Sequence, residues 1–296
     1  MNSSGIADYS PYNEEYGCNI FLHEGFPLPP GMTVKRVKEL MEFEVRHDDV
    51  FIVGYPKSGT NWMQIAVAKM SDSWGTCKIT DNGRVPVLEL PSRPSLEGFE
   101  KCVDAPSPRL IKSHLPLKYF PPKRAETKCK VIYIARNPKD VCVSWFNMNK
   151  AFAPINFSLT FAEYVERFVQ GKVFYSSYVD HVCDWRDLGL DDNVLHVTYE
   201  EMKADVVSVL RKITKFIGKS ESNEEVAKIA ESISFEKIKG SREQFNAATL
   251  DEKVSPFLRK GIIGDWKNHL TVAQNELFDK EIVEKLKQKD VNMIFE

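Results

Sequence analysis

The stretch VFIVGYPKSGTNWMQI, residues 50–65, decides the fold of this chain. Residues 50–54 are a short run of aliphatic and aromatic side chains, which is typical of a strand buried on both faces of a parallel sheet. A turn containing Gly59 follows, and residues 61–65 open a helix. Strand, glycine-bearing turn and helix in this order predict an α/β protein.

The rest of the chain alternates short apolar runs with longer segments that have a period of 3.6 residues. In one of these, Val206, Leu210 and Ile213 share one helical face. Strands are predicted at 50–54, 109–112, 131–135 and 194–197, and helices at 34–43, 61–70, 139–149, 160–173, 206–217 and 271–287. We therefore predict a single α/β domain in which helices flank a central parallel sheet.

Two long segments lack periodicity and are rich in proline or glycine, residues 80–108 and 240–265. Long irregular segments of a compact domain are usually functional. No repeat or linker divides the chain. We expect residues 1–296 to form one domain, with a core at about 45–290 and flexible residues at 1–20.

The composition excludes several classes of protein. The chain has 40 basic and 42 acidic residues among 296, and its net charge of −2 argues against a nucleic-acid coat or a polybasic membrane binder. The six cysteines show no CxxC or zinc spacing, so we expect reduced thiols and no metal. The chain shows no export signal and no apolar run of about 18 residues, so we expect a cytoplasmic protein.

The turn at residues 54–60 has the composition of an anion site. Such a turn points backbone N–H groups and the positive end of a helix dipole at one spot. Lys57 adds a charge, and the hydroxyls of Ser58 and Thr60 add donors. The lysine precedes Ser-Gly-Thr, unlike in the kinase motif G-x-x-x-x-G-K-[ST], and no aspartate that would hold Mg²⁺ ends a buried strand. A structural turn with an incidental lysine remains an alternative.

Residues 55–62, YPKSGTNW, resemble the phosphate loop of the cytosolic sulfotransferase family. In that family the loop grips the 5′-phosphosulfate of 3′-phosphoadenosine 5′-phosphosulfate (PAPS). Three more segments match the family in the same order across nearly the whole chain. The resemblance implies a sulfotransferase with a P-loop-kinase-like fold, PAPS as sulfuryl donor and no metal. The implied loop contacts to PAPS are Lys57, Ser58, Gly59, Thr60, Asn61 and Trp62.

Two of the matching segments carry cations that suit a phosphate group. In IARNPKDVCVSW, residues 134–145, an arginine and a serine lie eight positions apart across a strand-to-helix turn, and RKGIIGDWK, residues 259–267, opens with a basic pair. Alone, they also fit a capped helix and a solvated basic loop. The resemblance implies that the 3′-phosphate of PAPS is bound by Arg136, Ser144, Arg259, Lys260 and Gly261.

The fourth matching segment, IKSHLP at residues 111–116, lies at the exit of a predicted strand, where parallel α/β proteins place their chemistry. Lys112 and His114 share one face because side chains alternate along a strand. Histidine suits proton transfer at neutral pH, although a single loop histidine is more often structural. The resemblance implies that His114 deprotonates the acceptor, Lys57 stabilises the leaving oxygen and Lys112 holds the sulfuryl oxygens.

The resemblance also implies contacts to the adenine ring. Trp62 and Phe235 match the pair that flanks the ring, and Tyr199 matches a contact to its edge. Taken alone, aromatic residues at helix starts are more often part of the core. Ile233 departs from the family, which commonly has a threonine there, so one polar contact to the nucleotide is in doubt.

Residues 267–276 are similar to the family's dimerisation motif K-x-x-x-T-V-x-x-x-E. The matching residues are Lys267, Thr271, Val272 and Glu276, and they imply a homodimer. Thr271 also fits an N-cap of the last helix, which explains it without a partner.

The acceptor and the reaction leave alternatives open. We expect a small, aromatic or hydrophobic hydroxyl or amine compound, bound by residues near Phe21, 86–96, 146–152 and 245–258. A P-loop nucleoside kinase is the alternative enzyme, although the kinase motif and the Mg²⁺ ligand are missing. A nucleotide-binding module without transfer is the alternative outside enzymes, although the chain retains both His114 and Lys57.

Overall fold

The computed structural model describes residues 11–71, 85–92, 98–188, 191–240, 251, 253–254 and 259–296. Contacts group the chain into two compact units, each assembled from segments far apart in the sequence. We call residues 38–135 and 185–246 the sheet unit, and residues 1–37, 136–184 and 247–296 the helical unit. That the whole chain is one domain with a core at about 45–290 stays a prediction.

The sheet unit is built on four parallel strands in the order β6-β5-β7-β8. Their bounds are β5 (Val50–Val53), β6 (Leu110–Ser113), β7 (Lys130–Ala135) and β8 (Val194–Thr198). The apolar runs of β5 and β7 are almost completely buried, as strands covered on both faces require. The four predicted strands and the α/β class are confirmed.

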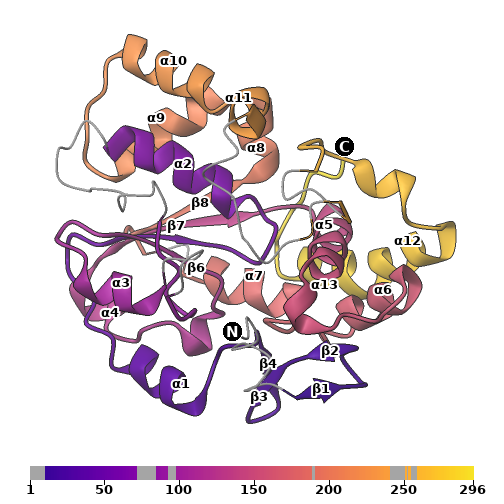
Figure 1. Ribbon diagram of the computed structural model, residues 1–296. Helices are drawn as coiled ribbons and strands as arrows, with labels where there is room; N and C mark the ends of the chain where they lie inside the picture. The colour runs from indigo at the N-terminus through magenta and orange to yellow at the C-terminus, as the bar shows by residue number, and fades with distance from the viewer. Residues whose placement is uncertain are drawn as a thin grey trace. The chain divides into compact units, whose positions relative to one another are not determined.

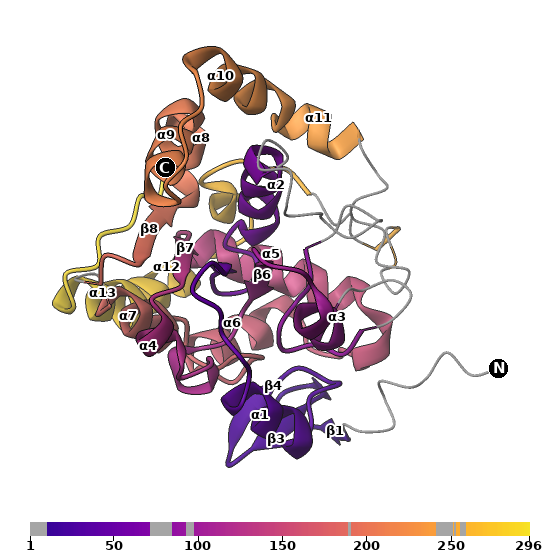
Figure 2. The same cartoon turned by 90° about the vertical axis from the view of Figure 1, so that its left-hand side faces the viewer.

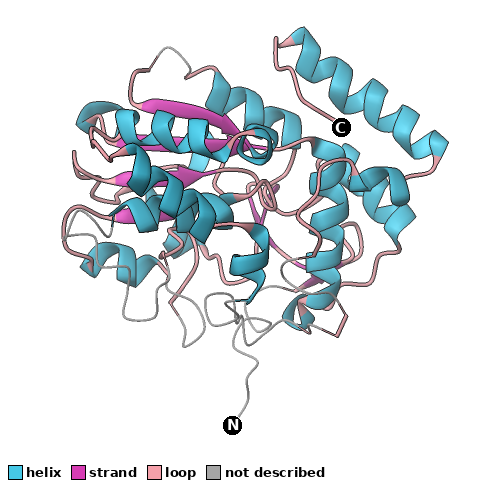
Figure 3. Ribbon diagram, turned by 90° about the horizontal axis from the view of Figure 1, so that it is seen from above, coloured by secondary structure: helices cyan, strands magenta, loops and turns pink. Residues whose placement is uncertain are grey.

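Helices of the sheet unit cover both faces of its sheet. Figure 1 shows α2 (Thr60–Ser71), α8 (Tyr199–Ala204), α9 (Val206–Phe216) and α10 (Asn223–Ser232) on one face, and α3 (Phe99–Asp104) and α4 (Arg124–Thr127) on the other. Figure 3, seen from above, shows helices lying over the strands of the sheet. The predicted apolar face of α9 is directed inward, because Leu210 and Ile213 are buried. The sheet unit also contains η3 (Leu117–Tyr119) and α11 (Phe235–Gly240).

The register of the sheet aligns the carboxyl ends of β5 and β6, and β7 extends two residues further in the same direction. Val53 of β5 pairs with Ser113 of β6 on one side and with Tyr133 of β7 on the other. The turn at 54–60 and His114 therefore leave the sheet at the same edge. Parallel α/β sheets bind their ligands at this edge.

The prediction of an irregular segment at 80–108 is wrong in two described places. Residues 99–104 form α3, and Val87 makes an isolated parallel bridge to Lys112 of β6. Proline is rare within sheets because it has no N–H to donate, so Pro86 argued against a strand at this place. In the structure Pro86 uses only its carbonyl, which accepts a hydrogen bond from the N–H of Lys112.

The helical unit combines two small hairpins with helices. The hairpins are β1 (Tyr12–Asn13) with β2 (Cys18–Asn19) and β3 (Phe21–His23) with β4 (Phe26–Leu28), and both Figure 1 and Figure 2 draw them side by side. Of the residues expected to be flexible, 1–10 lie outside the described part, and 11–20 include the first hairpin. The helical elements are α5 (Pro138–Ala151), η4 (Ala153–Ile155), α6 (Phe161–Val169), η6 (Asp265–Asn268), α12 (Val272–Phe278), the π-helical η7 (Asp279–Val283) and α13 (Glu284–Gln288).

The remaining two helices, α1 (Val34–Met41) and α7 (Tyr178–Arg186), contain the points where the chain passes from one unit to the other. All six predicted helices are present. The one predicted at 271–287 consists of α12, η7 and α13 in direct succession, with a π-helical turn in its middle.

Candidate functional site

The turn between β5 and α2 allows close approach to its backbone. Gly59 has a φ of +104°, and a Cβ atom there would lie 2.8 Å from Cδ2 of Tyr199. Lys57 has a φ of +71°, in the left-handed region that residues other than glycine rarely adopt. Such conformations are costly and concentrate at ligand sites. The backbone conformation of this turn is therefore stabilised by packing against neighbouring residues of the sheet unit, such as Tyr199.

Ser58 gives this turn a buried donor. The residue is 0% exposed, and its Oγ has no hydrogen-bond partner among the described residues. A buried hydroxyl in this state costs about 1–3 kcal/mol. Thr60 is also buried and begins α2, whose first N–H groups have no acceptor within the helix. These donors fit the oxygens of a phosphate or sulfate group, and so of the predicted 5′-phosphosulfate.

His114 is hydrogen-bonded to the same turn. Its Nδ1 lies 2.7 Å from the carbonyl oxygen of Gly54, which can only accept, so Nδ1 carries the proton in this contact. The other ring nitrogen, Nε2, is then an acceptor in the neutral ring. Orientation through one nitrogen leaves the second able to take a proton, as a general base requires.

Lys112 is joined to the start of α2. Its Nζ donates a hydrogen bond of 2.8 Å to Oδ1 of Asn61, so a predicted catalytic residue and a predicted nucleotide contact meet. Burial lowers the pKa of Lys112 to about 8, and the negative charge of Glu89 opposes this shift. Lys112 is therefore a cation at neutral pH whose charge is lost in mildly alkaline solution.

Two of the aromatic residues predicted at the adenine ring meet in the sheet unit. The rings of Trp62 and Tyr199 meet edge to face, with centroids 5.5 Å apart. Trp62 Nε1 donates to the backbone carbonyl of Ile233 at 2.9 Å, and Phe235 begins α11 two residues later. The side chain of Ile233 is 0% exposed. The isoleucine that departs from the family therefore contributes its backbone here, while its side chain packs in the core.

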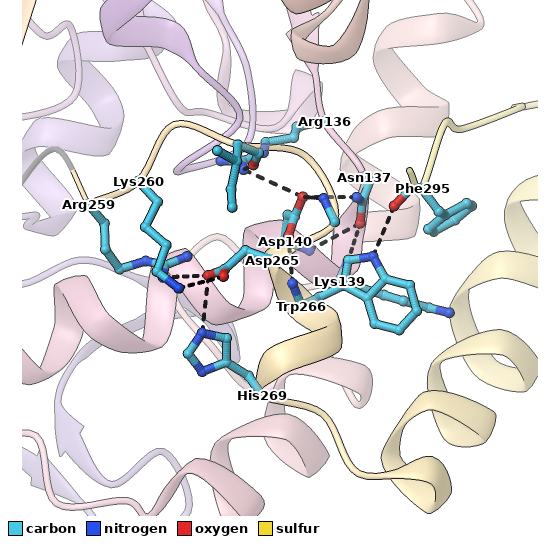
Figure 4. Close-up of polar contacts among 12 residues, drawn as sticks. Arg136, Asn137, Lys139, Asp140, Arg259, Lys260, Asp265, Trp266, His269 and Phe295 are labelled. Atoms are coloured by element: carbon cyan, nitrogen blue, oxygen red, sulfur yellow. Dashed lines mark hydrogen bonds and ion pairs between the residues drawn. The ribbon is translucent and has the colours of Figure 1, made fainter. Parts of the chain in front are cut away.

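The predicted 3′-phosphate residues lie in the helical unit. Arg136 directly follows β7, is 8% exposed and donates from Nη2 to the carbonyl of Ile262 at 3.0 Å. Asp140, one turn into α5, lies 3.6 Å from the same nitrogen. Its carboxylate also accepts from the N–H groups of Gly264 and Trp266, both at 2.9 Å. As Figure 4 shows, Asp140 thereby ties residues 262–266 to the start of α5.

Asp265 holds the basic pair of this segment. Its buried carboxylate lies 2.5 Å from Nη1 of Arg259 and 2.7 Å from Nζ of Lys260, and 3.1 Å from Nε2 of His269 (Figure 4). Burial alone would raise the pKa of Asp265, but the hydrogen bonds from Lys260 and Arg259 outweigh it and keep the pKa well below its usual range. The carboxylate therefore stays charged, and both cations converge on it. Gly261 follows with a φ of +66°.

Known proteins resemble this chain over nearly its whole length. A family model described as a sulfotransferase domain matches residues 47–290. Human sulfotransferase 1C2 is 36% identical over 280 residues, which cover 92% of this chain and 94% of that protein. The chain belongs to the sulfotransferase family. The predicted family and enzyme class are thereby confirmed.

Two further proteins that resemble this chain are also sulfotransferases. Sulfotransferase 1E1 of Cavia porcellus is 37% identical over 294 residues, which cover 97% of each chain. The crystal structure of mouse sulfotransferase SULT7A1 complexed with PAP has 34% sequence identity and a TM-score of 0.78, and the match covers 92% of this chain and 95% of that one. The predicted sulfotransferase fold is confirmed.

Other predicted residues of this sulfotransferase have the following positions. Ser144 is half-buried on α5, whose N-cap is Asn137. In the proposed dimer motif, Thr271 caps α12 and Val272 is 76% exposed. Most of segment 245–258 and residues 93–96, predicted to line the acceptor site, lie outside the described residues. Phe146 packs against Phe157, Phe161 and Tyr164 in the helical unit.

Three carboxylates of the sulfotransferase were missed by the sequence analysis: Glu89, Asp140 and Asp265. Glu89 falls in the segment 80–108 that the sequence predicts to be irregular, although its position inside the apolar run VPVLEL, residues 85–90, is a usable signal of burial. The two aspartates lie inside matching segments, but only their contacts reveal what they hold.

Within the described residues, no cluster of three or more metal-ligating side chains occurs. Among the described helices, none combines the length and apolar character that a membrane crossing demands. Cys18, Cys102, Cys129, Cys142 and Cys183 are buried and are not in disulfide bonds.

Proposed function

We propose that this protein transfers the sulfuryl group of PAPS to a hydroxyl or amine group of a small acceptor, with release of adenosine 3′,5′-bisphosphate. One observation carries the proposal: His114 is hydrogen-bonded to Gly54, the residue from which the phosphate loop starts. The contact joins a base to the loop that would hold the sulfuryl donor. The PAP complex of mouse SULT7A1 supports the choice of nucleotide.

We assign catalytic roles to three side chains. His114 Nε2 takes the proton of the acceptor while the acceptor oxygen or nitrogen forms its bond to sulfur. The bond between sulfur and the oxygen of the 5′-phosphate breaks, and Lys57 stabilises the charge that this oxygen gains. Lys112, held by Asn61, stabilises the sulfuryl oxygens. Positioning and electrostatic stabilisation supply the rate enhancement.

We assign each part of PAPS to its own set of residues. We assign the 5′-phosphosulfate to the turn at 54–60 and to Asn61, and the adenine ring to Trp62, Tyr199 and Phe235. The 3′-phosphate is assigned to the cations of the helical unit, together with the serine of α5 and the glycine after the basic pair: Arg136, Ser144, Arg259, Lys260 and Gly261.

Incubation with PAPS and a panel of phenols, alcohols and amines, in the presence of EDTA, tests the function. We expect a sulfate ester and adenosine 3′,5′-bisphosphate in equal amounts. Strict dependence on Mg²⁺ or use of ATP would contradict the proposal in favour of a kinase, and binding of PAPS without product would favour a binding module.

The variant His114→Ala tests the mechanism. Loss of a general base lowers rates by about 10²–10⁴-fold, and we expect a fall in kcat of about 1,000-fold with unchanged affinity for adenosine 3′,5′-bisphosphate. His47→Ala, at an exposed position of the same unit, is the control and should keep full activity. Substantial activity of His114→Ala at neutral pH would overturn the role of the base.

We further propose a cytoplasmic homodimer formed through Lys267, Thr271, Val272 and Glu276. The exposure of Val272 supports a contact there, because an isolated apolar side chain at the start of a helix gains from burial. Sedimentation at several protein concentrations tests this, and a monomer mass at all of them would contradict it.

A further inference from the structure

We propose that Glu89 is a positioning residue of the transfer reaction, which holds the turn after β6 and the positive charge of Lys112 in place. The inference rests on the functions proposed above for His114 and Lys112. It assigns to the reaction a side chain that acts through both of them.

The backbone places Glu89 beside the catalytic turn. The N–H of Lys112 donates to the carbonyl of Pro86, and the N–H of Leu88 donates to the carbonyl of Lys112, both at 2.9 Å. Val87 therefore forms a single parallel bridge to β6, and the chain turns directly after it, with the N–H of Leu90 donating to the carbonyl of Val87 at 3.3 Å. Glu89 lies in this turn, and its side chain reaches the residues that follow Lys112.

Both carboxylate oxygens of Glu89 bind this turn. Oε1 accepts from the N–H of His114 at 2.9 Å, and Oε2 accepts from Oγ of Ser113 at 3.0 Å. Ser113 Oγ in turn accepts from the N–H of Leu115 at 3.1 Å. Glu89 and Ser113 are each 0% exposed. A single buried carboxylate thus fixes the backbone on both sides of the histidine, while Gly54 orients its ring.

Glu89 also sets the charge of Lys112. Burial of Lys112 disfavours its cation, and the charge of Glu89 opposes this, with the net result of a pKa of about 8. Among the described residues, the charged or titratable side chains other than Lys112 on β6, on α2, in segment 85–90 and in the turns after β5 and β6 are Glu89, His114, Tyr55, Lys57 and Lys69. Lys69 lies eight residues, or about 12 Å, along α2 from Asn61. Glu89 is the one carboxylate among these described residues, so its loss should deprotonate Lys112 at a lower pH.

One nearby thiol does not complicate this titration. The charge of Glu89 also acts on Cys102, but burial raises the pKa of Cys102 far above neutral, so the thiol stays protonated throughout the relevant range.

Two variants separate the effect of the charge of Glu89 from the effect of its side-chain length. Glu89→Gln keeps the length and removes the charge; we expect the alkaline limb of kcat/KM to move about one pH unit lower, with a loss in kcat of about tenfold at neutral pH. Glu89→Asp keeps the charge and shortens the side chain; we expect the alkaline limb at the wild-type pH and a loss in kcat of about tenfold, because His114 is displaced.

Binding and stability distinguish this role from a merely structural one. Affinity for adenosine 3′,5′-bisphosphate should stay within about twofold of wild type in both variants, and thermal unfolding should show a folded protein. The control is Asp191→Asn, which removes a carboxylate paired with Arg124 in the same unit and should keep the wild-type pH profile. If Glu89→Gln does not fold, the kcat and pH profile of Glu89→Asp carry the test.

The outcomes separate this inference from the proposed function. An active wild type whose Glu89→Gln variant keeps both the alkaline limb and kcat overturns the inference alone. A Glu89→Asp variant that keeps the wild-type kcat also overturns the inference. A wild-type protein that binds the nucleotide but transfers nothing overturns the proposed function, and this inference with it.

Discussion

The phosphate loop of the sheet unit and the cation cluster of the helical unit both suit anions, but they neutralise charge in different ways. In the loop, the buried Ser58 hydroxyl has no partner among the described residues, and Lys112 is held by an uncharged amide. In the cluster, Asp265 pairs with Arg259 and Lys260, and Asp140 lies beside Arg136. Carboxylates thus pair directly with the cations of the cluster, whereas Lys112 beside the loop donates to a neutral amide and has its cation favoured by the charge of Glu89.

This difference corresponds to the two ends of the proposed donor. The 3′-phosphate keeps its charge throughout the reaction, so cations held in place by carboxylates need only bind it. At the 5′ end, charge moves from the acceptor to the leaving oxygen. Groups that are oriented in advance stabilise such developing charge most effectively.

The largest effect that sharpens this comparison is expected for Lys112→Arg. A guanidinium does not reproduce the contact of a compact ammonium group with Asn61, and we expect kcat to fall about 100-fold. Because the guanidinium stays charged, the alkaline limb near pH 8 should disappear from the pH profile. A wild-type profile that is flat from pH 7 to pH 10 would remove the role of Lys112 in this limb.

The same residue affects stability in the opposite direction. The folded-state pKa of Lys112, about 8, is below its ordinary value of 10.5, so its protonated form is disfavoured by folding. This unfavourable contribution is fully present below pH 8 and is relieved as the pH rises from 8 to 10.5. Between pH 8 and pH 10.5, activity should therefore fall while the contribution of Lys112 to the free energy of unfolding becomes less unfavourable.

An intermediate effect is expected for Asp265→Asn in the cation cluster. Without the carboxylate, Arg259 and Lys260 repel each other and lose their shared anchor. We expect affinity for adenosine 3′,5′-bisphosphate to fall about tenfold while affinity for adenosine 5′-monophosphate, which lacks the 3′-phosphate, stays unchanged. Asp180→Asn, an exposed carboxylate of the same unit, is the control in this calorimetric titration. Equal losses for both nucleotides would refute the proposed place of the 3′-phosphate.

The smallest effect is expected for Ser58→Ala. The variant removes a buried hydroxyl that lacks a partner, so the free energy of unfolding of the nucleotide-free protein should be unchanged or rise by about 1 kcal/mol. Affinity for adenosine 3′,5′-bisphosphate should fall about fivefold, because one donor to the 5′-phosphate is lost. Ser208→Ala on α9 should change neither quantity. A loss of stability without a loss of affinity would show that Ser58 has a structural role.

The four strands, the helix starts and the matching segments could be predicted because local patterns encode them. Val50–Val53 is apolar throughout, Asn137 caps α5, and Thr271 caps α12. The partners of the site residues could not be predicted in this way. Arg136 binds the carbonyl of Ile262, which is 126 positions away, and Val87 bridges to Lys112 of β6.

The sequence by itself determined the α/β class, the anion-binding turn, the family and the candidate cations, because backbone periodicity and short motifs are local properties of the chain. Only the tertiary structure decided that Gly54 orients His114, that Glu89 anchors the turn on both sides of it, and that Asp265 gathers Arg259 and Lys260. Hydrogen bonds and charges act over a few ångströms in space, and the separation of two residues along the chain does not determine that distance.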